Sequence, residues 1–318
     1  MSSDSPVKLH LPATVQEFGQ KLCDQVEQVI LGKRQAVQLV AVALLCEGHL
    51  LVDDVPGVGK TMLSRAIARS LDCSFARVQC TPDLLPGDLV GVSVFHPGQG
   101  EFRFRPGPIH HQVVLADEIN RATPKTQSAL LECMEERQAT VDGQTYPMPR
   151  PFLVLATQNP VEFEGTFPLP EAQLDRFLLR LHLGYPDLDS EIQMLQTHSQ
   201  EGAVERLKPV VTAAQLQTLK ESLQGIRFEP KLRKYLVELV QSTRRQAGVR
   251  LGASPRGSLA LYRSSLAWAA LQGRDYVIPD DIQHMVAPTL AHRLVGAGGF
   301  EQAEAILQRM LEQHPVPL

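Results

Sequence analysis

The residues best suited to chemistry form a loop rich in glycine and proline, between an apolar run and a Lys-Thr pair: Leu50-Leu51-Val52-Asp53-Asp54-Val55-Pro56-Gly57-Val58-Gly59-Lys60-Thr61. Glycine frees backbone N–H groups to surround phosphate oxygens, and the N-terminus of a following helix adds partial positive charge. In such a loop Lys60 reaches the β- and γ-phosphates of a nucleotide, and Thr61 offers its hydroxyl to Mg²⁺. The stretch therefore predicts a strand, a phosphate-binding loop and the start of a helix.

Asp54 is the one departure from the phosphate-loop pattern G-x-x-x-x-G-K-[ST], in which this position is a glycine. Aspartate tolerates a left-handed backbone better than most residues, so the loop stays feasible. Its carboxylate must, however, point away from the phosphates. The alternative interpretation is an ordinary glycine-rich turn between a strand and a helix, so support has to come from the rest of the chain.

Two acids and an amide follow two further apolar runs. Residues 112–118 end in Asp117 and Glu118, and the run 152–157 is followed closely by Asn159. In an open α/β sheet the ligand crevice lies at the carboxyl ends of the strands. We therefore expect Asp117 to hold Mg²⁺ through water, Glu118 to polarise the attacking water, and Asn159 to contact that water or the γ-phosphate. The alternatives are an acidic helix cap after a strand and a turn asparagine before a proline.

The composition is that of an ordinary soluble globular protein. The chain has 318 residues, of which 43% are hydrophobic and 21% charged, and this length suggests about two domains. The net charge of −4 provides no basic field that would favour nucleic acid or an anionic membrane. Neither a signal-peptide pattern nor a long apolar run is present, so we expect a cytoplasmic protein without direct membrane contact.

Strand and helix patterns alternate up to residue 186, and helical patterns take over from residue 187. We expect an α/β nucleotide-binding domain over 1–186, with inserted hairpins near 92–109 and 138–147, and a helical domain over 187–318. Thr14 and Glu17 form a capping-box pattern that predicts the start of the first helix, which should end near residues 31–33. Further strands are expected at 74–79, 112–118, 152–157 and 178–183, and a loop-rich segment at 82–91. Further helices are expected at 35–46, 61–71, 124–136, 171–177, 191–199, 213–223, 230–245, 255–272, 279–295 and 301–313.

Arg256 is the informative residue of the helical part. Ser254 and Pro255 predict a helix start that places Arg256 in the first turn, where the helix dipole disfavours a cation. An arginine in this position is expected to meet an anion. The alternative is a solvated arginine that costs a few tenths of a kcal/mol.

Taken together, the motifs resemble the MoxR family of AAA+ ATPases, over a stretch from about Val29 to the C-terminus. The strings that carry the resemblance are 53–61 (DDVPGVGKT), 81–86 (TPDLLP), 115–121 (LADEINR), 156–160 (ATQNP) and 170–177 (PEAQLDRF). This family also lacks the glycine at the position of Asp54. The resemblance implies a three-layer αβα nucleotide-binding domain with a parallel sheet, followed by an all-α lid.

The resemblance also implies roles for single residues. Asn159 falls at the sensor-one position, and Arg256 at the sensor-two position, where a helical lid contacts the γ-phosphate. Arg176 falls at the arginine-finger position, from which it would reach nucleotide in a neighbouring subunit; its alternative is an ordinary arginine at a helix end. The adenine-side contact would include Leu31 and Gly32. The remaining nucleotide contacts would be Pro56, Gly57, Val58, Gly59, Lys60, Thr61, Met62 and Asp117, with Thr61 and Asp117 on the metal.

These expectations combine into a Mg²⁺-dependent ATPase that hydrolyses ATP within a ring of identical chains, a hexamer. The resemblance implies a chaperone-like action on a protein client, one with a von Willebrand factor A domain. One rival interpretation is a binding module in which ATP only switches conformation. A second rival is a nucleic-acid motor, against which stand the acidic pI of about 6.2 and the scarcity of aromatic residues.

Overall fold

A five-stranded sheet lies at the centre of the computed structural model, which describes residues 11–159, 165–197 and 202–316. The strand order is β2-β5-β8-β1-β9, and every neighbouring pair is parallel. The strands are β1 (Leu50–Asp53), β2 (Phe75–Gln79), β5 (Val113–Asp117), β8 (Leu153–Gln158) and β9 (Leu179–Leu181). Parallel strands place all their carboxyl ends at one edge of the sheet, which we call the carboxyl edge. The opposite edge is the amino edge.

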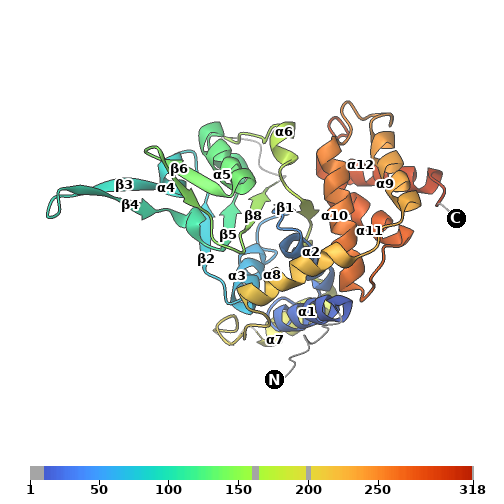
Figure 1. Cartoon of the computed structure of the whole chain (residues 1–318), viewed down its shortest axis with the longest axis horizontal. Coiled ribbons are helices and arrows are strands. Elements are labelled where there is room, and N and C mark those ends of the chain that lie inside the picture. The colour runs from blue at the N-terminus through green and yellow to red at the C-terminus, as the bar shows by residue number, and fades with distance from the viewer. Residues whose placement is uncertain (1–10, 160–164, 198–201, 317–318) are drawn as a thin grey trace, which may run out of the picture.

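Helices cover both faces of this sheet, because successive strand side chains point to opposite faces and the inner strands are apolar up to their last residues. Leu50 and Val52 of β1 belong to one core cluster, and Leu51 belongs to the other. The first cluster includes α1 (Leu11–Val26), α2 (Arg34–Leu45) and α3 (Lys60–Ser70), and the second includes α4 (Pro86–Val90) and α5 (Pro124–Glu136). This arrangement confirms the expected three-layer αβα domain (Figure 1).

The observed positions of α1 and α4 differ from the predictions made from the sequence. Helix α1 begins at Leu11, so Thr14 lies inside the helix and does not cap it, and the helix ends at Val26, before the expected end near residues 31–33. The segment expected to be a loop contains α4, which begins at Pro86 and is capped by the Asp88 carboxylate accepting the Leu85 N–H at 3.0 Å. A single turn of helix made by one proline and one acid is too short to produce a periodic pattern.

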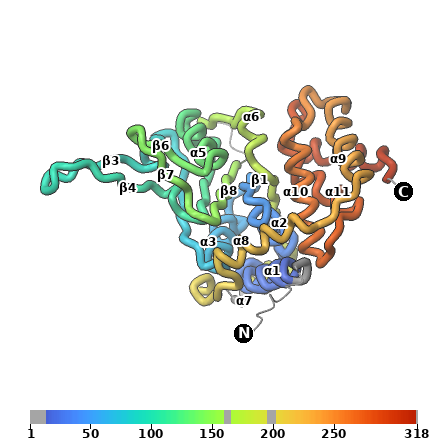
Figure 2. Tube along the Cα trace, in the orientation of Figure 1, coloured from blue at the N-terminus to red at the C-terminus, as the bar shows by residue number. Residues whose placement is uncertain are grey.

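Two antiparallel hairpins extend from the domain where the sequence predicts them. The first pairs β3 (Gly91–His96) with β4 (Glu101–Pro106) and projects away from the rest of the chain (Figures 1 and 2). The second pairs β6 (Gln138–Val141) with β7 (Gln144–Pro147). Its turn residues Asp142 and Gly143 both have positive φ, of 50° and 78°, as a tight two-residue hairpin turn requires. The rings of Phe104 and Tyr146 stack 3.8 Å apart and connect the two hairpins.

Beyond β9 the described residues contain helices and no further named strand. After β9 come α7 (Leu188–Thr197), α8 (Ala213–Ser222), α9 (Pro230–Thr243), α10 (Pro255–Leu271), α11 (Pro279–Leu290) and α12 (Phe300–Gln313), whereas α6 (Glu171–Leu174) lies just before β9. Helix α8 packs against α1 and α2, whereas α9 to α12 form a bundle on one side of the sheet (Figure 1). The predicted helix at 191–199 starts earlier, at Leu188, and its last two residues lie outside the described residues, as do the N-terminal tail and Pro160.

Within residues 11–159, 165–197 and 202–316, no helix is both long and apolar enough to cross a lipid bilayer.

Candidate nucleotide-binding and ATPase site

The loop between β1 and α3 has the backbone expected of a phosphate-binding loop. Gly57 and Gly59 adopt left-handed φ values of 88° and 95°, which side chains with a Cβ rarely adopt. Helix α3 begins at Lys60, directly after Gly59, so the N–H groups of its first turn have no partner within the helix. The loop therefore presents backbone donors and the positive end of a helix dipole at the carboxyl edge, as an anion-binding site needs.

Asp54 acts as an anchor for this loop. Its carboxylate is buried, with the residue only 1% exposed, and turns away from the loop towards the chain that leaves β9. The backbone N–H groups of Leu183 and Gly184 donate to its two oxygens, the latter at 3.1 Å. Lys60 Nζ donates to the Asp54 carbonyl oxygen at 2.8 Å. The residue that replaces glycine therefore connects the phosphate loop to β9 and contacts the lysine as well.

Asp117 lies buried at the end of β5, where two donors hold its carboxylate. Thr157 in β8 donates to Oδ1 at 2.7 Å, and Arg77 in β2 donates to Oδ2 at 2.7 Å. The register of the sheet explains the contact, because β5 pairs with β2 on one side and with β8 on the other. Asp117 is thus fixed in orientation by strands on both sides.

Glu118 follows with a left-handed backbone, φ 58°, which turns its side chain out of the sheet. Its N–H donates to Thr157 Oγ1 at 2.8 Å, so the same threonine positions both acids. Gln79 donates to Glu118 Oε2 at 2.8 Å, and Arg121 lies 3.1 Å from the same oxygen. Asn159, only 6% exposed, follows β8 at the same edge. The structure therefore brings the loop, the two acids and the asparagine to the carboxyl edge together.

The donor set at this edge fits Mg²⁺ that arrives with a nucleotide. The Asp117 carboxylate and the Thr61 hydroxyl are oxygen ligands, which Mg²⁺ prefers. In the part of the chain that the structure describes, no group of three or more His, Cys, Asp or Glu side chains could hold a metal ion alone. Mg²⁺ in phosphate-binding proteins is usually held by one or two protein ligands and completed by phosphates and water.

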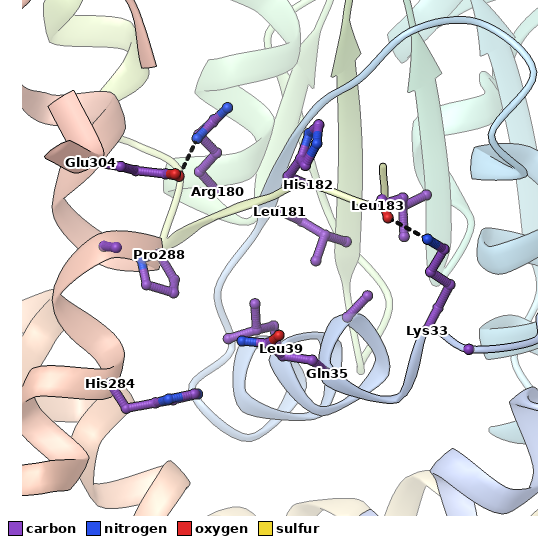
Figure 3. A pocket seen from close by; sticks show the side chains of 13 residues that line it. Lys33, Gln35, Leu39, Arg180, Leu181, His182, Leu183, His284, Pro288 and Glu304 are labelled. Carbon is purple, nitrogen blue, oxygen red and sulfur yellow. Dashed lines mark hydrogen bonds and ion pairs between the residues drawn. The ribbon is translucent and has the colours of Figure 1, made fainter. Parts of the chain in front are cut away.

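A cavity of about 410 Å³ lies beside β9 and is lined by Lys33 and by Gly32, one of the two residues expected on the adenine side. Figure 3 shows that side chains of α11 and α12 face those of α2 and β9 across it. Arg180 crosses between the two sides: it donates to Glu304 at 2.6 Å and to Asp53 at 3.0 Å. Burial raises the pKa of the Asp53 carboxyl, an effect that the Arg180 guanidinium partly offsets.

Arg176 and Arg256 lie together, but at the amino edge. Both donate to one carboxylate at the end of α5: Arg176 Nε lies 3.0 Å from Glu135 Oε2, and Arg256 contacts Glu135 Oε1. The three side chains line a cavity of about 310 Å³ together with residues 47–49, which precede β1. The phosphate loop follows β1 at the other end of that strand. Arg256 therefore meets an anion, as expected for its place in the first turn of α10, but it lies away from the phosphate loop of its own chain.

His49 connects α5 to the sheet close to this cavity. The Val154 N–H donates to its Nδ1 at 3.0 Å, and its Nε2 lies 3.1 Å from the Met134 carbonyl oxygen. Nδ1 is therefore an acceptor, so the ring is neutral with its proton on Nε2. Complete burial, together with the charge of nearby Arg137, lowers the pKa of His49 to about 4. The imidazole thus stays neutral at physiological pH and holds the end of α5 next to the arginine pair.

Several residues of the site were not predicted from the sequence. Thr157 had a signal, since it is a polar residue inside an otherwise apolar strand. Arg77, Glu135 and Arg180 had none, because each meets its partner only after folding; Arg77 is 40 residues from Asp117 in the chain. Local patterns identify residues within one motif and are silent on such distant pairs.

The comparisons with known proteins agree with this geometry. The profile of the "ATPase family associated with various cellular activities (AAA)" matches residues 49–179, and that of the "AAA lid domain" matches residues 241–310. The chain is 50% identical to "Uncharacterized protein YeaC" of Bacillus subtilis over 94% of each protein. It is 41% identical to "Chaperone MoxR1" of Mycobacterium tuberculosis, over 92% of this chain and 81% of that protein.

A solved structure from Cytophaga hutchinsonii supports the same fold. It is 36% identical in sequence, superimposes with a TM-score of 0.86, and the match covers 96% of this chain and 98% of that one. "Protein MoxR" of Paracoccus denitrificans is 32% identical over 89% of this chain. The expected resemblance is confirmed, and the chain belongs to the MoxR family of AAA+ ATPases.

Proposed function

We propose that the chain is a Mg²⁺-dependent ATPase that assembles as a ring, a hexamer, and couples ATP hydrolysis to remodelling of a protein client. One observation carries the proposal. The residues that would bind and cleave the triphosphate lie at the carboxyl edge, whereas Arg176 and Arg256, the two arginines expected on the phosphates, lie at the amino edge. A site divided in this way is complete only when the carboxyl edge of one subunit contacts the amino edge of a neighbouring subunit.

At the carboxyl edge, each residue has a separate role. The loop N–H groups and Lys60 bind the phosphates, and Thr61 with Asp117 would hold Mg²⁺, which neutralises phosphate charge and orients the terminal phosphoryl group. Glu118 accepts a proton from the attacking water, and Asn159 orients that water by a hydrogen bond. Glu118 must exchange its contacts with Gln79 and Arg121 for the water, so these contacts would regulate the timing of hydrolysis.

At the amino edge, the arginine pair supplies the charge that the carboxyl edge lacks. Phosphoryl transfer spreads negative charge over the phosphate oxygens, and a guanidinium in contact with them stabilises the transition state. A ring is built from head-to-tail contacts in which one surface meets a different surface of the next chain. Placing the amino edge of one chain against the carboxyl edge of its neighbour delivers Arg176 and Arg256 to the neighbouring nucleotide.

The β3–β4 hairpin is the proposed contact for the client. It projects from the domain (Figure 1), and Phe95 and Phe102 near its tip are 48% and 71% exposed, with ring centroids 5.2 Å apart. Exposed aromatic pairs on a projecting element are suited to holding another protein. One relative carries the name chaperone, and the family resemblance implies a client with a von Willebrand factor A domain. The proposed place of action is the cytoplasm, where ATP is supplied.

Steady-state ATP hydrolysis per subunit, measured without a client over a wide range of protein concentration, tests assembly first. The expected specific activity rises with concentration and reaches a plateau, since dilute chains lack a neighbour. Absence of hydrolysis at every concentration would contradict the proposal and favour a nucleotide-gated switch.

Mixing inactive variants tests the shared site more directly. Arg176→Ala and Glu118→Gln should each be inactive alone, by about 10³-fold for the arginine. Their mixture should regain activity, because an Arg176→Ala chain keeps its own loop and acids and receives intact arginines from a Glu118→Gln neighbour. Arg256→Ala should behave in the same way. A mixture as inactive as its parts would mean that the arginines serve the nucleotide of their own chain.

A further inference from the structure

The Glu135 carboxylate forms ion pairs with two arginines from separate parts of the chain. Arg176 follows α6 in the nucleotide-binding domain, and Arg256 lies in the first turn of α10 in the helical bundle. One arginine contacts Oε2 of the glutamate and the other contacts Oε1, so the carboxylate lies between them. The Glu135 side chain is about one-third exposed, which leaves the pair open to solvent on one side.

Neighbouring contacts fix this arrangement. The Ser254 hydroxyl, two residues before Arg256, donates to the Asp175 carboxylate at 2.8 Å, directly beside Arg176. Arg293 in the helical bundle donates to the other oxygen of Asp175 at 2.7 Å. These contacts keep the backbones of the two arginines next to each other, so both side chains can reach one small anion.

Two guanidinium groups that contact one carboxylate lie close enough to repel each other, and the negative charge between them offsets this repulsion. Each guanidinium carries five N–H donors, and the glutamate occupies only one edge of each, so donors remain for an external anion. Such a pair is preorganised to donate hydrogen bonds to the oxygens of a phosphate, because the two arginines already lie next to each other before the ligand arrives.

We propose that Glu135 is a positioning residue that aligns Arg176 and Arg256 on the terminal phosphate of a nucleoside triphosphate bound to a second copy of the chain. The proposal rests on the shared site described under "Proposed function". Glu135 does not touch the nucleotide; it sets where two arginines lie when the neighbour's phosphate reaches them.

The test compares Glu135→Gln, which keeps the shape of the side chain and removes its charge, with Glu136→Gln, which removes a charge from the adjacent exposed position of α5. Glu135→Gln should lower kcat roughly 10- to 100-fold, since small displacements of catalytic groups have effects of this size. The Kd for ATP of the isolated variant should stay that of the wild type, because its own phosphate loop is intact. Glu136→Gln should keep the wild-type kcat.

A mixture of Glu135→Gln and Glu118→Gln chains gives the decisive readout. In a randomly mixed ring about a quarter of the interfaces join a working loop to an intact arginine pair, so about a quarter of the wild-type rate should return. The Arg176→Ala and Glu118→Gln mixture serves as reference. If activity returns in the reference mixture but not in the mixture with Glu135→Gln, the proposed role of Glu135 is overturned and the shared site remains.

Three further results would overturn the proposal. If activity returns in neither mixture, the proposal of a site shared between two chains is contradicted, and so is the role of Glu135 that depends on it. A Glu135→Gln protein that unfolds at a lower temperature but keeps its kcat would show that the glutamate only joins the two domains. A higher kcat in Glu135→Gln would show that the carboxylate competes with the phosphate and does not align the arginines.

Discussion

The two edges of the parallel sheet are built in different ways. At the carboxyl edge, Asp117, Glu118 and Asn159 stand at or close after the ends of paired strands, and Lys60 begins α3 after the loop that follows β1. At the amino edge, Glu135, Arg176 and Arg256 come from the end of α5, from a short turn before β9 and from α10.

This difference implies a division of labour. Strand ends are rigid, so the residues proposed to hydrolyse the γ-phosphate bond can be preorganised within one chain. The arginine pair depends on how the helical bundle packs against the sheet, so its position can change when the bundle moves. In the proposed ring, each site therefore combines a rigid half with a half that can respond to a neighbour or a client.

The largest expected effects test the carboxyl edge. Lys60→Ala should abolish nucleotide binding, because it removes the cation proposed to bind the β- and γ-phosphates. Glu118→Gln should keep binding and lower turnover about 10³-fold or more, because it removes the proton acceptor but not the loop. Binding of a fluorescent ATP analogue, measured beside ATP hydrolysis, separates the two outcomes.

Arg65→Ala is a suitable control for these variants, since it removes a surface cation from the same helix α3. Normal turnover in Glu118→Gln would contradict the proposed division of labour between the two edges, because the residue that accepts the proton from water would then have to lie elsewhere.

A smaller effect concerns the rigidity of the amino edge. The folded-state pKa of His49 is about 4, below its ordinary value of 6.5. The unfolded chain therefore binds more protons between these pH values, so the stabilisation present above pH 6.5 is lost as pH falls towards 4. The difference corresponds to about 3 kcal/mol in the free energy of unfolding. Urea unfolding of the wild type between pH 7 and 4 should show this loss.

His49→Asn provides the comparison, because asparagine offers an acceptor to the Val154 N–H but does not titrate. The variant should be less stable at pH 7, since it loses the contact to Met134, and its stability should fall less steeply below pH 6.5. Equal pH dependence in both proteins would show that His49 does not set the acid sensitivity of this edge.

The smallest expected effect concerns Asp54. Asp54→Asn replaces one of two carboxylate acceptors by a donor facing the N–H of Leu183 or Gly184, so the phosphate loop loses part of its anchor. Loss of one charge-assisted hydrogen bond should weaken ATP binding about tenfold, with a smaller change in kcat. Isothermal titration with ATP and a kcat–KM comparison measure this split.

Asp72→Asn is a matched control, because Asp72 is exposed and its left-handed backbone suits asparagine. An unchanged KM in Asp54→Asn would mean that the loop holds its shape without the anchor, as loops with glycine at this position do.

The sequence interpretation succeeded wherever residues in one short segment act together. The 124–136 helix was predicted with its observed bounds, because Pro124 starts it and its apolar residues lie on one side. The structure adds that the Thr123 side chain caps this helix. The second hairpin followed from Asp142 and Gly143, whose types suit its turn. The start of α1 was misplaced because the capping pattern at Thr14 and Glu17 also occurs inside a longer helix.

Spacing within a few residues was enough to predict the α/β domain with its helical continuation, the glycine-rich loop and the acids at strand ends. Two contacts form only in the folded chain: Asp54 accepts from the residues that follow β9, and Arg256 shares Glu135 with Arg176. The last contact joins residues 121 positions apart through the packing of α10 against the sheet. No local pattern encodes such a distance, because it arises when separate elements bury their apolar faces against one another.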